Sequence, residues 1–340
     1  VAISMIGVSA IGMILFTTRP VGDAMATTIW GTSSSWTLTA LPLFVWMGEI
    51  LFRTKLSENL FKGLSPWMQK LPGGLIHVNV VGCALFAAIS GSSAATVATV
   101  GKMSIPELRK RKYPEKILLG SLAGSGTLGL LIPPSIILII YGVTVQESIA
   151  KLFIAGIIPG IMIALIFMSY VIIWSLINKS VMPKSQETYS FFEKIKRSKQ
   201  LLPVILLILG VIGSIYSGVA TATEAASLGV VGALILSYFQ KSLNIKTFKN
   251  SLLGATKTSC MIAFILAGST FLSLAMGFTG LPRNLAIWIQ NMDLSPYVLI
   301  FVLMIFYIIL GMFLDGISAV VLTMAIIEPM IRQAGFDMIW

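Results

Sequence analysis

Residues 74–104 read GLIHVNVVGCALFAAISGSSAATVATVGKMS, an apolar run interrupted at its centre by Ser90-Gly91-Ser92-Ser93. Basic residues flank the run on both sides, with Lys70 before it and Arg109 after it. Because segments rich in Lys and Arg stay on the cytoplasmic side of a membrane, both ends of the run are expected on that side. The sequence therefore predicts a re-entrant helical hairpin that enters the membrane, turns at the Ser-Gly-Ser-Ser stretch and returns.

The composition of the whole chain is that of a membrane protein. Hydrophobic residues make up 56% of the 340 residues and charged residues only 11%, against about 25% charged in soluble domains. The formal charge of +11 comes from short loops between apolar runs, so nucleic acid is not an expected partner. We predict an all-α integral membrane protein embedded in a lipid bilayer, with apolar runs at 1–17, 36–52, 74–104, 115–143, 153–177, 201–216, 222–239, 258–276 and 296–330.

The distribution of Lys and Arg gives a topology. Four segments assigned to the cytoplasm, 53–73, 102–116, 178–200 and 240–257, hold all but four of the 24 Lys and Arg residues. The four on the outside are Arg19, Lys151, Arg283 and Arg332. Since 296–330 lies between outside residues, it is predicted to be a second re-entrant hairpin, which enters from the opposite face and turns near Asp315-Gly316.

An internal repeat links the two hairpins. A constant offset of 225 residues pairs Gly91 with Gly316, Ser93 with Ser318 and Ala94 with Ala319. The same offset matches segments 55–69 and 281–291, which we interpret as amphipathic helices in the two interfaces, with ordinary surface loops as the alternative. Opposed hairpins related by one offset predict an inverted repeat, an architecture of many secondary transporters.

The crossing segment 115–143 contains a second interruption. Residues 123–135 read AGSGTLGLLIPPS, with three glycines and then Pro133-Pro134. Glycines permit unusual backbone angles and prolines remove backbone donors, so this transmembrane helix is predicted to break. A proline kink used only for packing is the alternative.

Broken helices inside a bilayer expose backbone carbonyl and N–H groups where a cavity can use them. Carbonyl and hydroxyl oxygens suit a hard cation, and we expect sodium as the coupling ion, with no transition metal, no other cofactor and no catalytic residue. The expected sodium ligands are Ser90, Gly91, Ser92, Ser93, Gly126, Thr127, Pro133, Asp315, Gly316 and Ser318. The expected contacts to an anionic solute are Ser92, Ser93, Thr127, Pro134, Ser135 and Ser318.

The serines, Asp315 and Glu224 need separate comment. A serine at a hairpin tip can cap a helix without touching an ion. Asp315 is costly inside a membrane unless a cavity, cation or partner compensates it, so it is a candidate ion ligand. Glu224 lies where a span begins, and capping alone would explain it.

The sequence resembles the large, DctM-type membrane subunit of tripartite ATP-independent periplasmic (TRAP) transporters. The stretches that carry the resemblance are Leu41-Pro42-Leu43-Phe44, Ser90-Gly91-Ser92, Ile132-Pro133-Pro134-Ser135, Phe153–Gly160, Tyr216–Ala226 and Gly311–Asp315. The resemblance implies an elevator-type, sodium-driven importer of organic acids such as C4-dicarboxylates or sialic acid, with a fold like that of the ion-transporter superfamily. It also implies a small four-helix membrane subunit, a periplasmic substrate-binding protein and a multi-pass location in the bacterial cytoplasmic (inner) membrane.

The predicted organisation follows from topology and resemblance together. The family's first apolar helix and its second broken helix, with a Thr-Pro-Pro motif, are not found in the 340 residues. We therefore expect the chain to be truncated after the second hairpin, with the Asp315 sodium site and the substrate pocket incomplete. The predicted parts are scaffold helices (1–52), a cytoplasmic arm helix (53–73), a first-repeat transport unit (74–152, with hairpin 74–104 and broken helix 115–143), scaffold helices with a cytoplasmic loop at 178–200 (153–257), a second-repeat helix with an outer arm helix (258–292), and the second hairpin (293–340).

Other functions are weaker fits. A stand-alone sodium/anion symporter without a binding protein is the main alternative, and a passive channel lacks a filter sequence. An intramembrane protease would need a base beside its nucleophile, but His77 lies thirteen residues from Ser90 on one helix, about 20 Å away at 1.5 Å per residue.

Overall fold

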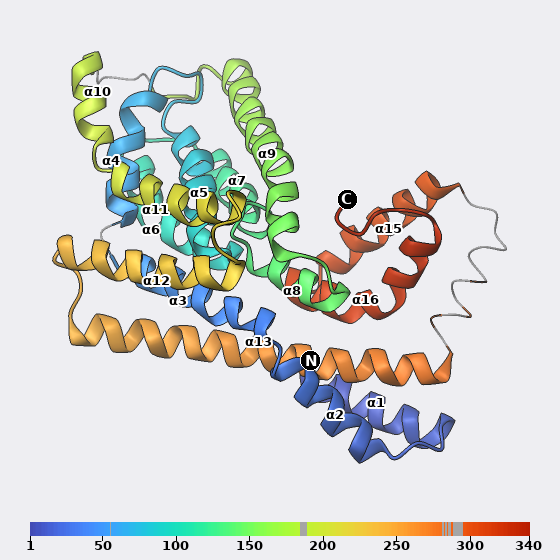
Figure 1. Ribbon diagram of the computed structural model, residues 1–340. Coiled ribbons are helices and arrows are strands. Elements are labelled where there is room, and N and C mark those ends of the chain that lie inside the picture. The colour runs from blue at the N-terminus through green and yellow to red at the C-terminus, as the bar shows by residue number, and fades with distance from the viewer. Residues whose placement is uncertain (55, 184–188, 281, 283, 285–286, 288–294) are drawn as a thin grey trace. The chain divides into compact units, whose positions relative to one another are not determined.

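The computed structural model describes residues 1–54, 56–183, 189–280, 282, 284, 287 and 295–340. Throughout these residues the regular secondary structure is helical (Figure 1). The helices are α1 (Ala2–Phe16), α2 (Val21–Ser33), η1 (Trp36–Thr39), α3 (Ala40–Phe52), α4 (Leu56–Met68), α5 (Ile76–Ser90), α6 (Ser93–Lys110), α7 (Glu115–Gly126), η2 (Thr127–Leu130), α8 (Ile136–Val145), α9 (Ile149–Ile177), α10 (Phe191–Ser198), α11 (Leu202–Tyr216), α12 (Ala222–Phe239), α13 (Ile245–Thr279), α15 (Pro296–Gly311) and α16 (Gly316–Gln333).

Several helices are suited to a bilayer. Within the described ranges, α9, α12, α13 and α16 are each long and apolar enough to cross a membrane, and the count rises to six if each of two bent pairs forms one span. Four shorter apolar helices, α1, α5, α8 and α15, add to this set. The all-helical, apolar fold confirms the prediction of a multi-pass membrane protein.

The chain forms two compact units, each with its own core. The first unit comprises residues 1–39, 139–152 and 257–340, and the second comprises 40–138 and 153–256. The predicted division of the chain into scaffold helices and transport parts concerns function, and it stays a prediction.

In the second unit, α5 is the central helix and packs against α3, α4, α6, α7 and η2. Its apolar side chains are buried around its circumference, with Ile76, Phe86 and Ile89 almost fully enclosed. A helix that is apolar all round belongs in an interior, whether of protein or lipid. The second unit thus holds the first predicted hairpin at its centre.

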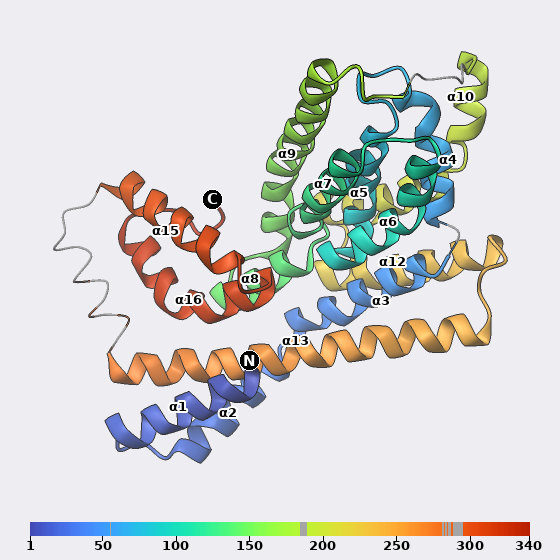
Figure 2. The same ribbon diagram turned by 180° about the vertical axis from the view of Figure 1, so that it is seen from behind.

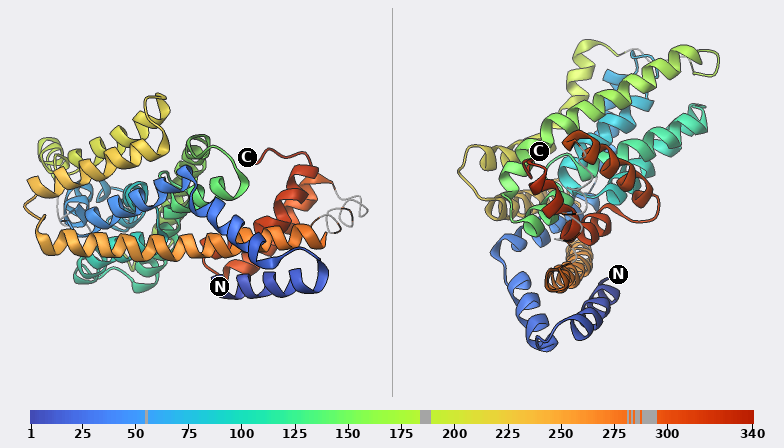
Figure 3. Two further views of the ribbon diagram at one scale, coloured as in Figure 1. Left: turned by 60° about the horizontal axis from the view of Figure 1, so that its bottom comes forward. Right: turned by 90° about the vertical axis from the view of Figure 1, so that its right-hand side faces the viewer.

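In the first unit, α1 and α2 lie along the C-terminal half of α13 (Figure 3). Met13 of α1 packs with Phe271 and Ala275 of α13, and all three are buried. The Thr32 hydroxyl donates a hydrogen bond of 3.1 Å to the Thr270 hydroxyl, which joins α2 to α13.

The first hairpin breaks where the sequence predicts. Helix α5 ends at Ser90, Gly91 follows with φ 58°, and Ser92 is the N-cap of α6. Glycine adopts this left-handed conformation without the steric cost that a side chain brings, so it is suited to end a helix here. α5 and α6 pack against each other, as expected of a hairpin.

The second hairpin also breaks at its predicted tip. α15 ends at Gly311, and α16 begins at Gly316 behind its N-cap, Asp315 (Figure 2). The two N-caps, Ser92 and Asp315, are 223 residues apart, whereas the sequence identities share an offset of 225. The caps and the identities are thus out of register by two residues, and the inverted repeat stays a prediction.

The predicted break in 115–143 is present as well. α7 ends at Gly126, a 3-10 turn (η2) follows, and α8 begins only at Ile136. Pro133 and Pro134 lie in the gap, where the absence of an N–H on each prevents a continuous helical ladder.

Three parts of the helical structure go beyond the sequence prediction. Helix α2 has few strongly apolar residues and was not predicted. α10 forms inside the predicted loop 178–200, and α13 extends back to Ile245 within the predicted loop 240–257. Most of the predicted segment 55–69 forms a helix, α4. The other predicted segment, 281–291, lies largely outside the described residues.

Candidate functional site

The tip of the first hairpin is docked on the break between η2 and α8. The amide of Ile136, the first residue of α8, donates a hydrogen bond of 3.2 Å to the carbonyl of Gly91. A Cβ atom on Gly91 would lie 2.9 Å from both the Ile136 nitrogen and the Pro134 oxygen. Only a glycine allows the two backbones to approach this closely.

A second glycine makes the contact from the other side. A Cβ atom on Gly129 of η2 would lie 2.9 Å from the carbonyl carbon and oxygen of Ser92. The docked segments, 90–93 and 126–136, therefore meet backbone to backbone. The structure thus brings together most of the expected site residues of the first repeat, and we call this assembly the first tip site.

Backbone groups at the helix ends of this tip lack hydrogen-bond partners among the described residues, and α3 packs close to two of them: a Cβ atom on Gly48 would lie 3.3 Å from the Ile89 oxygen and 3.5 Å from the Ser90 oxygen. Within the part of the chain that the structure describes, no hydrogen bond reaches the carbonyls of Ala88, Ile89 or Ser90 at the end of α5, and none leaves the amides of Ser93 or Ala94 at the start of α6. Free carbonyls at a helix C-terminus favour a cation and free amides at an N-terminus favour an anion. One turn of chain therefore offers both kinds of partner.

Three side chains hold the tip in shape. The buried hydroxyls of Ser90 and Thr96 lie 2.9 Å apart, and the Thr96 hydroxyl donates a 2.7 Å hydrogen bond to the Ser92 carbonyl. The Ser92 hydroxyl accepts a 3.5 Å bond from the Ala95 amide as the α6 N-cap. Thr96 was not predicted as part of the site, although its spacing of four from Ser92 is the signal for such back-bonding in a helix.

The remaining predicted residues near the break have different surroundings. Thr127 is exposed, and its hydroxyl donates a 2.7 Å hydrogen bond to the Gly124 carbonyl, so the lone pairs of the hydroxyl oxygen stay available. Ser135 is buried, and its hydroxyl donates a 2.6 Å hydrogen bond to the Leu130 carbonyl, which joins the two sides of the break. Pro133 and Pro134 are buried.

Helix α9 backs the break through two more glycines. A Cβ atom on Gly156 would lie 2.8 Å from the Leu131 oxygen, and one on Gly160 would lie 2.8 Å from Ile132 Cγ1. Small residues four apart let membrane helices approach closely. The irregular backbone at 131–133 is therefore buried in protein, as a broken helix in lipid requires.

Asp315 and Ser318 lie in the first unit, at the tip of the second hairpin. Asp315 is exposed, and its Oδ2 accepts a 3.2 Å hydrogen bond from the Ser318 amide. Farther along, the hydroxyls of Tyr307 and Thr323 lie 2.6 Å apart and join α15 to α16. Capping uses one carboxylate oxygen, and the exposed carboxylate remains open to a cation.

Two other acidic or basic candidates have structural partners. Glu224 accepts 2.8 Å hydrogen bonds from the amide and hydroxyl of Thr221, and the Glu224 amide donates back to Thr221, which is a complete capping box for α12. His77 Nε2 lies 2.8 Å from the Pro72 carbonyl, at the opposite end of α5 from Ser90. Capping accounts for Glu224, whereas His77 Nδ1 is buried and has no hydrogen-bond partner among the described residues.

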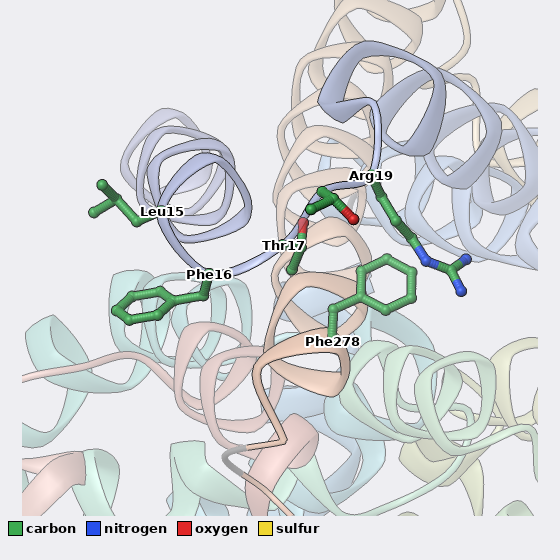
Figure 4. Close-up of a pocket in the computed structure, with 6 residues that line it drawn as sticks. Leu15, Phe16, Thr17, Arg19 and Phe278 are labelled. Atoms are coloured by element: carbon green, nitrogen blue, oxygen red, sulfur yellow. The ribbon is translucent and has the colours of Figure 1, made fainter.

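Two hollows in the first unit fall outside the predicted site. One, of about 440 Å³, is lined mainly by hydroxyl side chains and glycines, with Gln146 and Glu147 at one side. The other, of about 570 Å³, is open, and Arg19 lines it with its guanidinium 4.6 Å from the centre of the Phe278 ring (Figure 4). In the described part of the chain, no three His, Cys, Asp or Glu residues gather as a metal site.

Comparisons with known proteins identify relatives over nearly the whole chain. The family described as "Tripartite ATP-independent periplasmic transporter, DctM component" matches residues 1–340. The chain is 31% identical to the C4-dicarboxylate TRAP transporter large permease protein DctM of Pseudomonas aeruginosa, over 96% of this chain and 76% of that protein.

Two further relatives carry other substrate names. The 2,3-diketo-L-gulonate TRAP transporter large permease protein YiaN of Escherichia coli is 31% identical over 93% of this chain and 74% of its own length. The sialic acid TRAP transporter large permease protein SiaM of Vibrio cholerae is 31% identical over 90% and 71%. The chain therefore belongs to the DctM family, the large membrane permease components of tripartite ATP-independent periplasmic transporters.

Proposed function

We propose that this chain is the permease subunit of a sodium-coupled secondary transporter that imports a small organic acid across the bacterial inner membrane by an elevator mechanism. The observation that carries the proposal is the first tip site, where the free carbonyls that end α5 lie one turn from the free amides that begin α6. A cation and a carboxylate are the ligands that such a pair of helix ends favours.

The first tip site has the chemistry for sodium. The carbonyls of Ala88, Ile89 and Ser90 and the exposed Thr127 hydroxyl are hard oxygen donors, which suit an alkali cation better than a transition metal. A second sodium is assigned to the Asp315 carboxylate at the tip of the second hairpin, with Gly316 and Ser318 contributing backbone or hydroxyl groups. Each site is proposed within its own unit.

The solute carboxylate is assigned to the α6 N-terminus. The amides of Ser93 and Ala94 are free to donate, and Ser92, Thr127, Pro134 and Ser135 border the same break. Ser135 has its proton committed to the Leu130 carbonyl, so its contribution is to hold the break in shape. Ser318 is assigned to the solute at the second tip.

The partners are proposed from the family. A small four-helix membrane subunit and a periplasmic substrate-binding protein would complete the transporter, and the substrates in the relatives' names, C4-dicarboxylate, 2,3-diketo-L-gulonate and sialic acid, indicate the solute class. One relative, the isethionate TRAP transporter permease protein DctMQ, carries a combined name that fits a fused small subunit.

The test is uptake by the complete transporter in liposomes. Candidate organic acids are offered with an inward sodium gradient, with the binding protein present or absent. Uptake that requires both the gradient and the binding protein supports the proposal. Equal uptake without the binding protein would instead support a stand-alone symporter, and uptake that follows the solute gradient alone would mark a channel.

A further inference from the structure

Helix α10 has an apolar face that is largely exposed. Phe191 is 69% exposed, Phe192 is 77% exposed and Ile195 is 42% exposed. These positions fall on one side of a short helix, at spacings of three and four residues. Two phenylalanines facing water would be unfavourable, so this face is suited to an apolar surrounding.

The side of α10 that carries Phe191, Lys194 and Ser198 is fixed to the second unit through Trp67 of α4. Trp67 Nε1 donates a 2.7 Å hydrogen bond to the Ser198 hydroxyl, and Lys194 Nζ lies 5.3 Å from the centre of the Trp67 ring. The Trp67 and Phe191 rings meet edge to face, with centroids 6.3 Å apart. Trp67 therefore holds α10 by one side, which includes an edge of Phe191, and leaves Phe192 and Ile195 exposed.

The charge on this segment is strongly positive. Lys194, Lys196, Arg197 and Lys199 are set against the single acid Glu193, whose carboxylate accepts from the Ser190 amide as part of the α10 capping box. Lys196 and Lys199 are exposed. Basic residues beside an apolar helical face are typical of helices that lie in a membrane interface and bind anionic lipids.

The direction of α10 agrees with such a position. α10 is bent by 58° from α11, the apolar helix that follows it. If α11 runs into the bilayer, α10 turns toward the plane of the surface. The Lys and Arg count places the 178–200 segment on the cytoplasmic side.

We propose that α10 is a lipid-docking helix, which inserts Phe191, Phe192 and Ile195 into the cytoplasmic leaflet while Lys196 and Lys199 bind anionic phospholipid headgroups. The proposal concerns where the chain meets the bilayer and does not depend on the transported solute.

The test is hydrogen exchange of the peptide that covers residues 191–199, in the full chain reconstituted into nanodiscs. Discs of phosphatidylcholine alone are compared with discs that also contain phosphatidylglycerol. Wild-type amides should exchange severalfold more slowly when the anionic lipid is present. K196Q/K199Q should lose that difference, because the charge attraction is removed.

The control variant is K246Q/K249Q, which removes two exposed lysines from the start of α13 and should keep the wild-type difference. Phe192→Ser should speed exchange in both kinds of disc, since it removes apolar contact and leaves the charge. Equal exchange of wild-type α10 in both discs would overturn the proposal. Protection that appears only when the small membrane subunit is added would assign this face to a protein partner instead.

Discussion

The Ile136 amide donates its hydrogen bond across to the Gly91 carbonyl, so the hairpin tip and the broken helix are joined by backbone alone. No side chain at either position takes part in the bond. Substitution at Gly91 should therefore act through backbone geometry, because its φ of 58° disfavours a Cβ atom and its close neighbours leave no room for one.

We expect Gly91→Ala to destabilise the second unit by about 1–3 kcal/mol, the usual cost of a non-glycine residue held in a sparsely populated backbone region. Sodium-dependent uptake should fall with it, because the tip moves off the break. The measurement is thermal unfolding in detergent alongside uptake in liposomes. Gly120→Ala is the control: a Cβ atom there meets nothing within 4 Å and φ is ordinary, so its unfolding temperature should stay equal or rise. A Gly91→Ala protein as stable as Gly120→Ala would contradict the docking geometry.

The breaks could be predicted from sequence because they depend on local chemistry. Gly91 in its serine-rich stretch and the paired Pro133-Pro134 weaken a helix locally, wherever the rest of the chain lies. The spacing of four predicts the Thr96 bond to the Ser92 carbonyl, but not the contact with Ser90, which depends on the turn that brings the two hydroxyls within 2.9 Å. Helix α10 was missed although Ser190 and Glu193 have the spacing of a capping box; its attachment to Trp67, more than a hundred residues earlier, could not be predicted.

The functional assignment had a different origin. The tip residues alone indicated oxygen-rich, broken helices, which many transporters share. The family came from several short motifs taken together, and the match over residues 1–340 confirms it. Which residues bind the ion and the solute depends on positions of helices far apart in sequence, and these assignments stay predictions.

The hydroxyl pair of Ser90 and Thr96 should behave as one unit. Thr96→Val keeps the side-chain shape but removes the bonds to Ser90 and to the Ser92 carbonyl, at an expected cost of about 1 kcal/mol for each bond lost. Ser90→Ala should then cost less unfolding free energy in the Thr96→Val background than in wild type. A double-mutant cycle of unfolding free energies measures this difference. Strictly additive effects would show that the pair is not formed. We also expect both single variants to raise the sodium concentration needed for half-maximal uptake.

Asp315 has two roles that substitution can separate. Asn also caps helices well, so Asp315→Asn should leave the unfolding temperature nearly unchanged, whereas Asp315→Ala should lose about 1 kcal/mol of stability with the cap. Both variants should weaken the sodium dependence of uptake, because both remove the carboxylate charge. If Asp315→Asn transports with the wild-type response to sodium, the carboxylate is a cap and no more.

Tyr113 ties the start of the first hairpin to the loop between α6 and α7, and its stability contribution should depend on pH. The Leu75 amide donates a 3.1 Å hydrogen bond to the Tyr113 hydroxyl oxygen, and burial raises the pKa of this phenol above its ordinary value of 10.0. Folding therefore disfavours the ionised form. The stabilisation is complete below pH 10 and is lost as the pH rises through the folded-state pKa.

Tyr113→Phe should lower the unfolding free energy by about 1–2 kcal/mol near neutral pH, because the Leu75 amide loses its partner. Above pH 10 the difference in unfolding free energy between wild type and Tyr113→Phe should become smaller. Denaturant unfolding of both proteins across this range measures the difference, and a difference that stays constant with pH would mean that Tyr113 ionises equally in the folded and unfolded chains.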